Sequence, residues 1–291
     1  MSVSQPTGVI HDIGYRHYEG RRLGRGHAFT SLMAHGLRGV WGLRRPARAK
    51  IMPFTLAGIM LMPAAASIML MALSAGEGGV AYPSYTSIMQ VVVAIFLAAQ
   101  SPYLVAPDLR FRVLPLYLSR PVQIADYVGA KLAAMAIALY ALIAVPLTVE
   151  FVGELLVNPP GDSDVNGYVA AMVAGVLHAV LLSAVGLALA SFTPRRGLGV
   201  ASVIAFYLLT SAVSLALGAA FTALSRDSAA MWALLINPFF LVEAVQTWLF
   251  GTPSSTGDAT VDGPLPLVLV VVVTALAIGG LFLRYRSAAS R

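Results

Sequence analysis

The chain has 291 residues, of which 58% are hydrophobic and only 11% are charged, and its formal net charge is +6. Soluble domains carry charge on about a quarter of their residues, so this composition excludes the soluble class and favours a membrane protein. The sequence contains no cysteine, which excludes disulfides, thiol catalysis and thiolate metal sites. We interpret the positive charge as a determinant of membrane topology and expect no nucleic-acid partner.

Residues 1–50 form a basic, mostly polar segment. Because this segment precedes the first apolar run, no secretory signal peptide is expected. From His27 to Leu43, apolar side chains such as Leu32, Leu37 and Val40 recur every three or four residues, opposite polar ones. This spacing predicts an amphipathic helix that lies in the inner membrane interface, anchors the chain there and flanks a cytosolic partner.

Residues 51–291 are expected to form a six-span domain, so the predicted fold class is an all-α polytopic membrane protein. A helix needs roughly 20 apolar residues to cross a hydrocarbon core ~30 Å thick. Lys131 lies near the start of the third apolar run, where we expect it to extend its ammonium group back to the interface. The six runs that meet the length requirement are 51–76, 78–107, 127–151, 165–194, 197–225 and 263–283.

The Lys and Arg residues determine the expected orientation. All except Arg226 lie in clusters, which fall within residues 1–50, within 110–131, at Arg195 and Arg196, and after residue 283. These clusters alternate with the predicted spans, as the positive-inside rule requires when both termini are cytosolic. The excess of Arg over Lys, with abundant Ala, Val and Gly, is typical of a GC-rich bacterial genome. The expected location is therefore a bacterial plasma membrane, with both termini in the cytoplasm.

Residues 229–250 are apolar but are not expected to cross the membrane, because a crossing would place the C-terminal arginines outside. Asn237 and Pro238 interrupt the helix, since proline lacks an amide hydrogen and disfavours helix at the preceding residue. Glu243 is costly in lipid, so a hydroxyl, a helix N-terminus or water must receive it. We expect either a re-entrant hairpin that enters from outside, with Asn237, Pro238 and Glu243 at an outer gate, or a helix in the outer leaflet. Replacing Glu243 by Leu is expected to stabilise this segment.

Polar residues inside the spans are candidates for a translocation path. Tyr207, Thr210 and Ser214 recur at three- and four-residue spacing in the fifth span, and Gln90 lies in the second. Such residues face protein or water sooner than lipid, so they either line a path or join helices by hydrogen bonds. His178 is the lone titratable residue in the middle of a span, where helix-to-helix bonding is its expected role. No pair of carboxylates is expected inside a span.

The motifs of nucleotide-binding and hydrolytic enzymes are missing from the sequence. It has no Gly-Lys-Ser/Thr phosphate loop, no His-Glu-x-x-His zinc helix and no Gly-x-Ser-x-Gly elbow. We therefore expect no enzymatic activity, no catalytic residue, no metal and no cofactor in this chain.

Two segments resemble the type-2 ABC exporter permeases. The first, LSRPVQIADYVGAKL, covers Leu118–Leu132, and the second, INPFFLVEAVQTWLFG, covers Ile236–Gly251. In that family a cytosolic SRP…(D/E)Y…K segment opens the third span and an outer NP…VEA segment precedes the sixth, and both stand at those places here. The layout of the whole chain is similar to that of the family, although Gln246 stands where a basic residue is common.

The resemblance implies a partner that supplies energy. Such a permease is one half of a dimeric channel, paired with an identical or related permease, and separate ATP-binding subunits with their ATP and Mg dock from the cytosol. Segment 108–126 would be the coupling element, and its basic and apolar residues suit a short interfacial helix. The expected coupling residues are Arg110, Arg112, Arg120, Asp126 and Lys131. The expected function is ATP-driven export, or efflux, of an amphipathic or hydrophobic small molecule, drug or peptide across the plasma membrane.

Three other functional classes remain to be compared with export. An ion-coupled secondary transporter would show intramembrane acids or paired broken spans from an inverted repeat, and neither is evident. An intramembrane enzyme would need a catalytic constellation, which is missing. An ABC-type complex with a sensing or mechanical role would share the layout of an exporter, so that alternative stays open.

Overall fold

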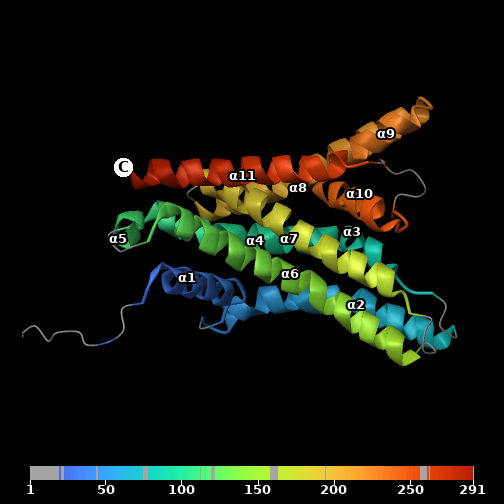
Figure 1. Cartoon of the computed structure of the whole chain (residues 1–291), viewed down its shortest axis with the longest axis horizontal. Coiled ribbons are helices and arrows are strands. Elements are labelled where there is room, and N and C mark those ends of the chain that lie inside the picture. The colour runs from blue at the N-terminus through green and yellow to red at the C-terminus, as the bar shows by residue number, and fades with distance from the viewer. Residues whose placement is uncertain are drawn as a thin grey trace, which may run out of the picture.

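The computed structural model describes residues 20, 23–43, 45–74, 78–111, 113–118, 122–157, 163–193, 195–255, 261 and 263–290. Within these ranges the regular secondary structure is helical and no strand occurs, as the sequence predicts. The long helices run side by side along the longest axis of the molecule (Figure 1).

Six helices within the described ranges are long and apolar enough to cross a membrane, in agreement with the six predicted spans. The number would be seven if the bent pair α9 and α10 formed one span. The chain therefore fits a membrane protein with transmembrane helices. The six helices are α2 (Arg48–Leu73), α4 (Gln90–Arg110), α6 (Ile124–Val157), α7 (Val165–Phe192), α8 (Arg196–Ala223) and α11 (Leu265–Ala289).

Two of the predicted spans differ from the helices that form. The uncharged run 78–107 is not one helix, because the 3-10 turn η1 (Tyr82–Ser84) and the short helix α3 (Tyr85–Ile88) precede α4. The third predicted span ends at residue 151, whereas α6 continues for six more residues and includes Glu154 as well as Glu150. The prediction ended that span beside a charged residue, but glutamate is a good helix former.

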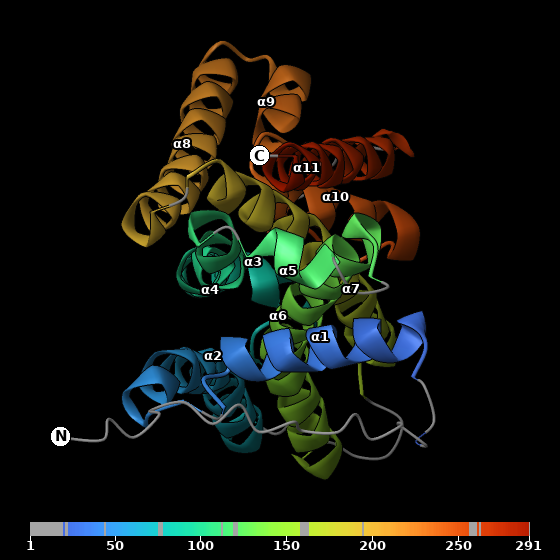
Figure 2. The same cartoon turned by 90° about the vertical axis from the view of Figure 1, so that its left-hand side faces the viewer.

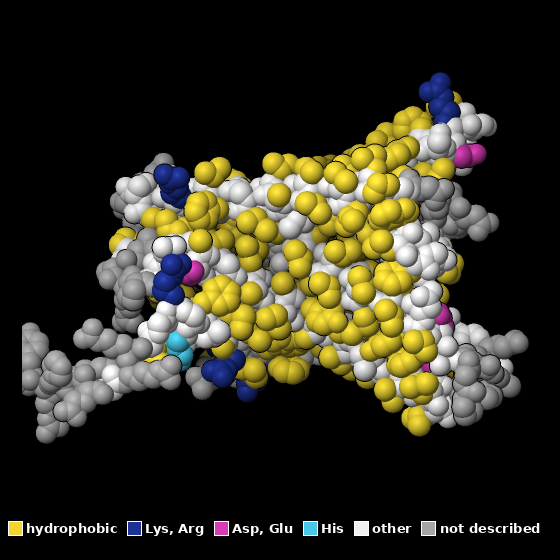
Figure 3. Space-filling view, in the orientation of Figure 1, with side chains coloured by type: hydrophobic (Ala, Val, Ile, Leu, Met, Phe, Trp, Pro, Cys, Tyr) yellow, Lys and Arg dark blue, Asp and Glu magenta, His cyan; other side chains and the backbone are white. Residues whose placement is uncertain are grey.

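Helix α7 lies at the centre of the bundle, where it packs against α4, α6, α8, α10 and α11. Small residues allow this close packing: a Cβ added to Gly186 would lie 2.7 Å from the side chain of Leu97 on α4. The outer helices α2, α8 and α11 leave most of their apolar side chains exposed. On the face shown in Figure 3, hydrophobic side chains cover the middle of the molecule. Such a surface suits lipid or a second subunit.

Helix α1 (Arg25–Val40) lies across the ends of the long helices and not along them (Figure 2). Its apolar stripe packs on α6 and α4, with Val40 buried and Leu32 and Leu37 against the core. On the opposite side, Thr30 and His35 are exposed. The predicted amphipathic helix is therefore present, although it starts two residues and ends three residues earlier than expected, and its place in the membrane interface stays a prediction.

The two ends of the bundle differ in charge. At one end lie the starts of α2, α6 and α8 and the ends of α4, α7 and α11, with most of the Lys and Arg residues (Figures 1 and 3). We call this the basic end. The opposite end, which we call the acidic end, holds buried carboxylates of α6 and α10 and the turn between α8 and α9, with Arg226. Among the described residues, the structure gathers the Lys and Arg residues other than Arg226 at one end, as their alternation along the sequence predicts.

Candidate functional site

Helices α9 (Asp227–Leu234) and α10 (Pro238–Phe250) form a hairpin with a bend of 113° at its break. Asn237 has an extended backbone, and its side-chain oxygen accepts a hydrogen bond from the Phe239 amide at 2.9 Å, which caps α10. Pro238 is the first residue of α10, a position where an amide hydrogen would have no helical partner. The predicted break at Asn237 and Pro238 is confirmed.

The break of the hairpin lies against residues predicted for the translocation path. The Asn237 side-chain amide donates to Gln90 Oε1 at 3.1 Å and to Ser211 Oγ at 3.4 Å. Ser214 Oγ donates to the Leu234 carbonyl at 3.1 Å. These bonds tie the break to the start of α4 and to the middle of α8. The structure therefore brings Gln90 and Ser214 together with the predicted outer gate.

Aromatic rings pack beside the break. The Phe239 ring lies 6.0 Å from the Tyr207 ring and 5.6 Å from the His178 imidazole, measured between centroids. Thr210 differs from its neighbours, because its hydroxyl donates to the carbonyls of Phe206 and Tyr207 in its own helix and not to the hairpin. Helices α4, α7, α8 and α10 enclose a mostly apolar cavity of about 20 Å³ here, with room for about one water molecule. This part of the bundle is packed and closed.

Glu243 of α10 is only 2% exposed and is surrounded by hydrogen-bond donors. It accepts from the Ser87 hydroxyl of α3, from the Ser254 hydroxyl at 3.2 Å, and from the amide and hydroxyl of Ser255, the hydroxyl at 2.9 Å. Serine hydroxyls thus donate hydrogen bonds to this carboxylate, which is one of the arrangements that the sequence suggests. The contacts argue against the expectation that leucine would stabilise the position, since leucine would remove the acceptor of the Ser87 and Ser255 hydroxyls.

A pair of buried carboxylates on α6 also lies at the acidic end. Glu154 is 5% exposed and accepts from the Tyr82 hydroxyl of η1 and from the Asp164 amide at 3.0 Å. Burial and the bond to Glu154 raise the pKa of the Tyr82 hydroxyl, which lies outside the six candidate spans, well above its usual range. Glu150, one turn earlier, is 0% exposed. Glu150 and Glu154 thus form a carboxylate pair on the helix of a candidate span, which the sequence analysis did not anticipate.

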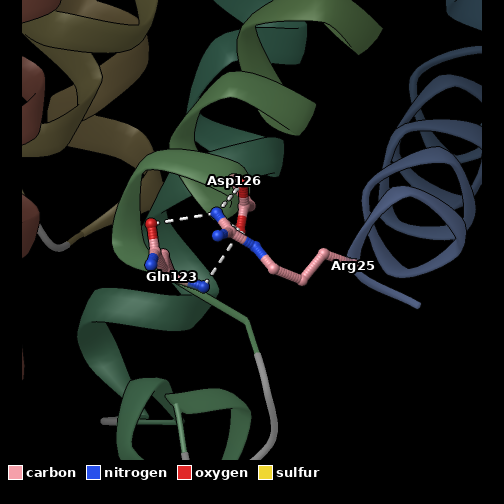
Figure 4. Close-up of polar contacts among 3 residues, drawn as sticks. All are labelled: Arg25, Gln123 and Asp126. Carbon is pink, nitrogen blue, oxygen red and sulfur yellow. Dashed lines mark hydrogen bonds and ion pairs between the residues drawn. The ribbon is translucent and has the colours of Figure 1, made fainter.

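At the basic end, an ion pair joins α1 to α6 (Figure 4). The Arg25 guanidinium donates to the Asp126 carboxylate at 2.9 Å and to Gln123 Oε1 at 2.9 Å. Asp126 also accepts from the Gln123 amide at 3.1 Å, so it caps the N-terminus of its own helix. Asp126, a predicted coupling residue, thus makes its contacts within this chain.

Lys131 of α6 and Asp108 of α4 form a second ion pair, in which the two side chains are 16% and 13% exposed. The Lys131 ammonium also donates to the Leu104 carbonyl, and the Tyr285 hydroxyl of α11 donates to Asp108 at 3.3 Å. The expectation that Lys131 reaches back to the interface missed this partner, which lies 23 residues away in the sequence. The pair holds the ends of three helices together.

The other predicted coupling residues lie on or near segment 108–126. Arg110 is exposed at the end of α4, beside the exposed ring of Phe111. The expected short helix is present as α5 (Leu114–Leu118), which lies at the basic end (Figure 2). A cavity of about 160 Å³ opens between α1, α4, α5 and α6, next to Lys131. Arg112 and Arg120 lie outside the described residues, and their coupling role stays a prediction.

No family model matches this chain, and no curated protein matches it either. The resemblance to type-2 ABC exporter permeases therefore rests on segments 118–132 and 236–251 and on the order of the helices. Among the described residues, no group of three or more His, Asp or Glu side chains is placed to hold a metal ion.

Proposed function

We propose that this chain is the permease subunit of an ATP-driven ABC exporter. It moves an amphipathic or hydrophobic small molecule, drug or peptide out of a bacterial cell, while a separate cytosolic subunit binds ATP and Mg and hydrolyses the ATP. A second permease, identical or related, completes the channel. The basic end faces the cytosol together with both termini, and the acidic end faces outward.

The hairpin is the observation that carries this proposal. Its break reaches the middle of α8 through Ser211, while both of its outer ends lie at the acidic end of the bundle. At the end of α10, the Phe250 carbonyl accepts from Asn166, near the start of α7, at 3.4 Å. The hydrogen bonds of Asn237 satisfy the interrupted helix at this depth, as a bilayer demands. A segment that enters and leaves on one side, with Glu243 held among hydroxyls, suits a gate over the outer end of a path.

The basic end supports the proposal because it offers a face for the ATPase subunit. Arg110 and Phe111 are exposed there, α5 follows them, and α1 lies crosswise nearby (Figure 2). The Lys131–Asp108 pair joins α4 to α6, and the packing of α1 on α6 brings Arg25 to Asp126, so a displacement imposed on this face passes into the long helices. We assign Asp126 and Lys131 to the frame of the docking face, and Arg110 to its surface.

An ion-coupled secondary transporter is the second candidate, and one observation favours it. Glu150 and Glu154 are buried acids of a candidate span, the feature that sequence reasoning did not find. The energy source separates the two candidates. Export by membrane vesicles requires ATP and the partner ATPase in the first case, and an ion gradient in the second.

Affinity purification of the tagged chain from its native membrane tests the proposal. We expect an ATP-binding subunit to co-purify, and its ATP hydrolysis to drive uptake of a hydrophobic fluorescent cation into inverted membrane vesicles. Reversing Arg110 and Arg120 to Glu is expected to weaken attachment of the ATPase or to uncouple ATP hydrolysis from transport. Reversing Arg226, at the opposite end, is the matched control and is expected to leave both unchanged.

Three results would argue against this assignment. Purification without any ATPase, combined with transport driven by an ion gradient alone, would favour the secondary transporter. An ATPase that co-purifies but drives transport of no compound in a broad panel would favour the sensing or mechanical complex. Equal loss of attachment in the Arg226 variant would show that surface charge in general, and not the proposed face, holds the ATPase.

A further inference from the structure

Glu150 is a buried carboxyl group that the proposed function does not use. It lies on α6 and is 0% exposed, and neither of its oxygens has a hydrogen-bond partner of normal geometry within the described residues. The hydroxyl that faces it from α2 belongs to Ser67, which accepts from the Val80 amide at 2.8 Å. A carboxyl group in such a place is far more costly in its ionised form than in its neutral form.

The surroundings of Glu150 offer no positive charge to offset an ionised carboxylate. The titratable groups that face it are Glu154 on its own helix and the hydroxyls of Tyr82 and Tyr85 from η1 and α3. Tyr85 directs its hydroxyl to a backbone carbonyl of α2. The ion pairs among the described residues lie at the basic end. A charged Glu150 would therefore meet the repulsion of Glu154 and no cation, with the Ser67 hydroxyl as the one group that favours the charge.

The contacts of Glu154 lead from the surface of the acidic end towards Glu150. Asp164, at the start of α7, is exposed, and its amide donates to Glu154 at 3.0 Å. Glu154 lies one helical turn from Glu150, on the same face of α6. The Glu154 carboxylate thus stands between the surface of the acidic end and the buried group.

We propose that Glu150 is a proton-binding site, occupied at neutral pH and reached from the acidic end through Glu154. The bound proton forms the O–H bond of a neutral carboxylic acid, and its release leaves one negative charge on Glu150. The inference does not depend on the energy source of transport, and it applies to both candidate functions.

Infrared spectroscopy of the purified full-length chain tests the site, because the C=O stretch of a carboxylic acid is separate from the bands of a carboxylate. We expect wild-type protein at neutral pH to show the band of a buried acid, and Glu150→Gln to lack it. Glu243→Gln is the matched control and is expected to keep the band, since Glu243 is equally buried but its oxygens are hydrogen-bonded by serines. Because glutamine is the neutral isostere of a protonated glutamate, Glu150→Gln is expected to fold like the wild type.

The route is tested by the rate at which the acid band shifts after transfer from H₂O to ²H₂O. Glu154→Gln is expected to keep the band but to slow this exchange by about tenfold or more, because a relay of the proton is removed. Absence of the acid band from wild-type protein, or an unchanged band in Glu150→Gln, overturns the proposed site. Equal exchange rates in wild type and Glu154→Gln overturn the route. The wild-type spectrum decides the first question even if a variant fails to fold.

Discussion

The two ends of the bundle hold their buried acids in opposite ways. At the basic end Asp108 is paired with the cation of Lys131, whereas at the acidic end Glu154 and Glu243 are held by hydroxyls and amides. Breaking an ion pair leaves a buried charge unpaired, which is strongly unfavourable. A hydroxyl that leaves a carboxylate can be replaced by water, at a much smaller cost. The comparison teaches that the contacts of Asp108 at the basic end are costlier to break than those of Glu243 at the acidic end, as the proposed outer gate requires.

This difference agrees with the direction of the proposed export. A partner that hydrolyses ATP needs a firm face on which to act, and the Lys131–Asp108 pair between α4 and α6 provides it. A substrate that leaves at the acidic end needs a closure that water can enter, and the serines around Glu243 provide that. Substitutions at each end can test whether the contrast holds.

The largest effect is expected from Lys131→Met. It leaves the partly buried Asp108 without its cation, and we expect a loss of roughly 3 kcal/mol of unfolding free energy, measured by denaturant titration in detergent micelles. Replacing both partners, with Lys131→Met and Asp108→Leu together, removes the unpaired charge and is expected to recover most of the loss. A double variant as unstable as the single one would mean that the pair is not what fixes this end.

Glu243→Leu is expected to destabilise the chain by about 2 kcal/mol, because the serine donors lose a buried acceptor but lie where water can reach them. Glu243→Gln keeps one acceptor oxygen and is expected to lose about half as much. The fluorescence of Trp248, on the same helix, should report the change, while that of Trp41 at the basic end should not. A Leu variant more stable than the wild type would support the expectation from sequence that leucine stabilises this segment. The hydroxyl contacts of Glu243 would then not hold the acidic end together.

The sequence alone predicts those features of the fold that depend on local properties of the chain. Apolar length and charge alternation predicted the long helices, because both follow from the bilayer and need no tertiary contact. Proline chemistry predicted the break at Asn237 and Pro238 in the same local way. The partners of Glu243 and Lys131 could not be predicted, because Ser87 lies 156 residues from Glu243 and Asp108 lies 23 residues from Lys131 in the sequence.

Two further misses have physical reasons. The carboxylate pair on α6 went unseen because a charge was taken to end the span, although burial against η1 and α2 lets the helix continue. The path residues were grouped by spacing on one helix, but spacing cannot tell which helix they face. Asn237 donates hydrogen bonds to Gln90 of α4 and to Ser211 of α8. These contacts join three helices, so they can be seen only in the packed structure.

Asn237→Ala is expected to have a smaller effect, about 1 kcal/mol, from loss of the cap of α10 and of the bonds to Gln90 and Ser211. Thermal unfolding followed by circular dichroism measures it. Asn166→Ala is the matched control, because its bond to Phe250 is exposed and long at 3.4 Å, and it is expected to change little. Equal effects of the two substitutions would mean that the depth of the break confers no additional stability.

The smallest effect is expected from Arg25→Ala. Its ion pair with Asp126 is solvent-exposed, and such pairs contribute little to stability because water and salt screen them. Unfolding of the variant should be indistinguishable from that of the wild type, while proteolysis of α1 in native conditions should become faster. A destabilisation as large as that of Lys131→Met would show that the exposed pair, and not the buried one, fixes the basic end.

The most direct test of the account is which side of the membrane each end faces. Because the chain has no cysteine, single cysteines at Ser163 of the acidic end and Ser290 of the basic end can be labelled separately. With an impermeant thiol reagent on intact cells, the account predicts that Ser163→Cys is labelled and that Ser290→Cys is labelled only after the membrane is permeabilised. Labelling of Ser290→Cys on intact cells would contradict it, since the basic end could not then meet a cytosolic ATPase.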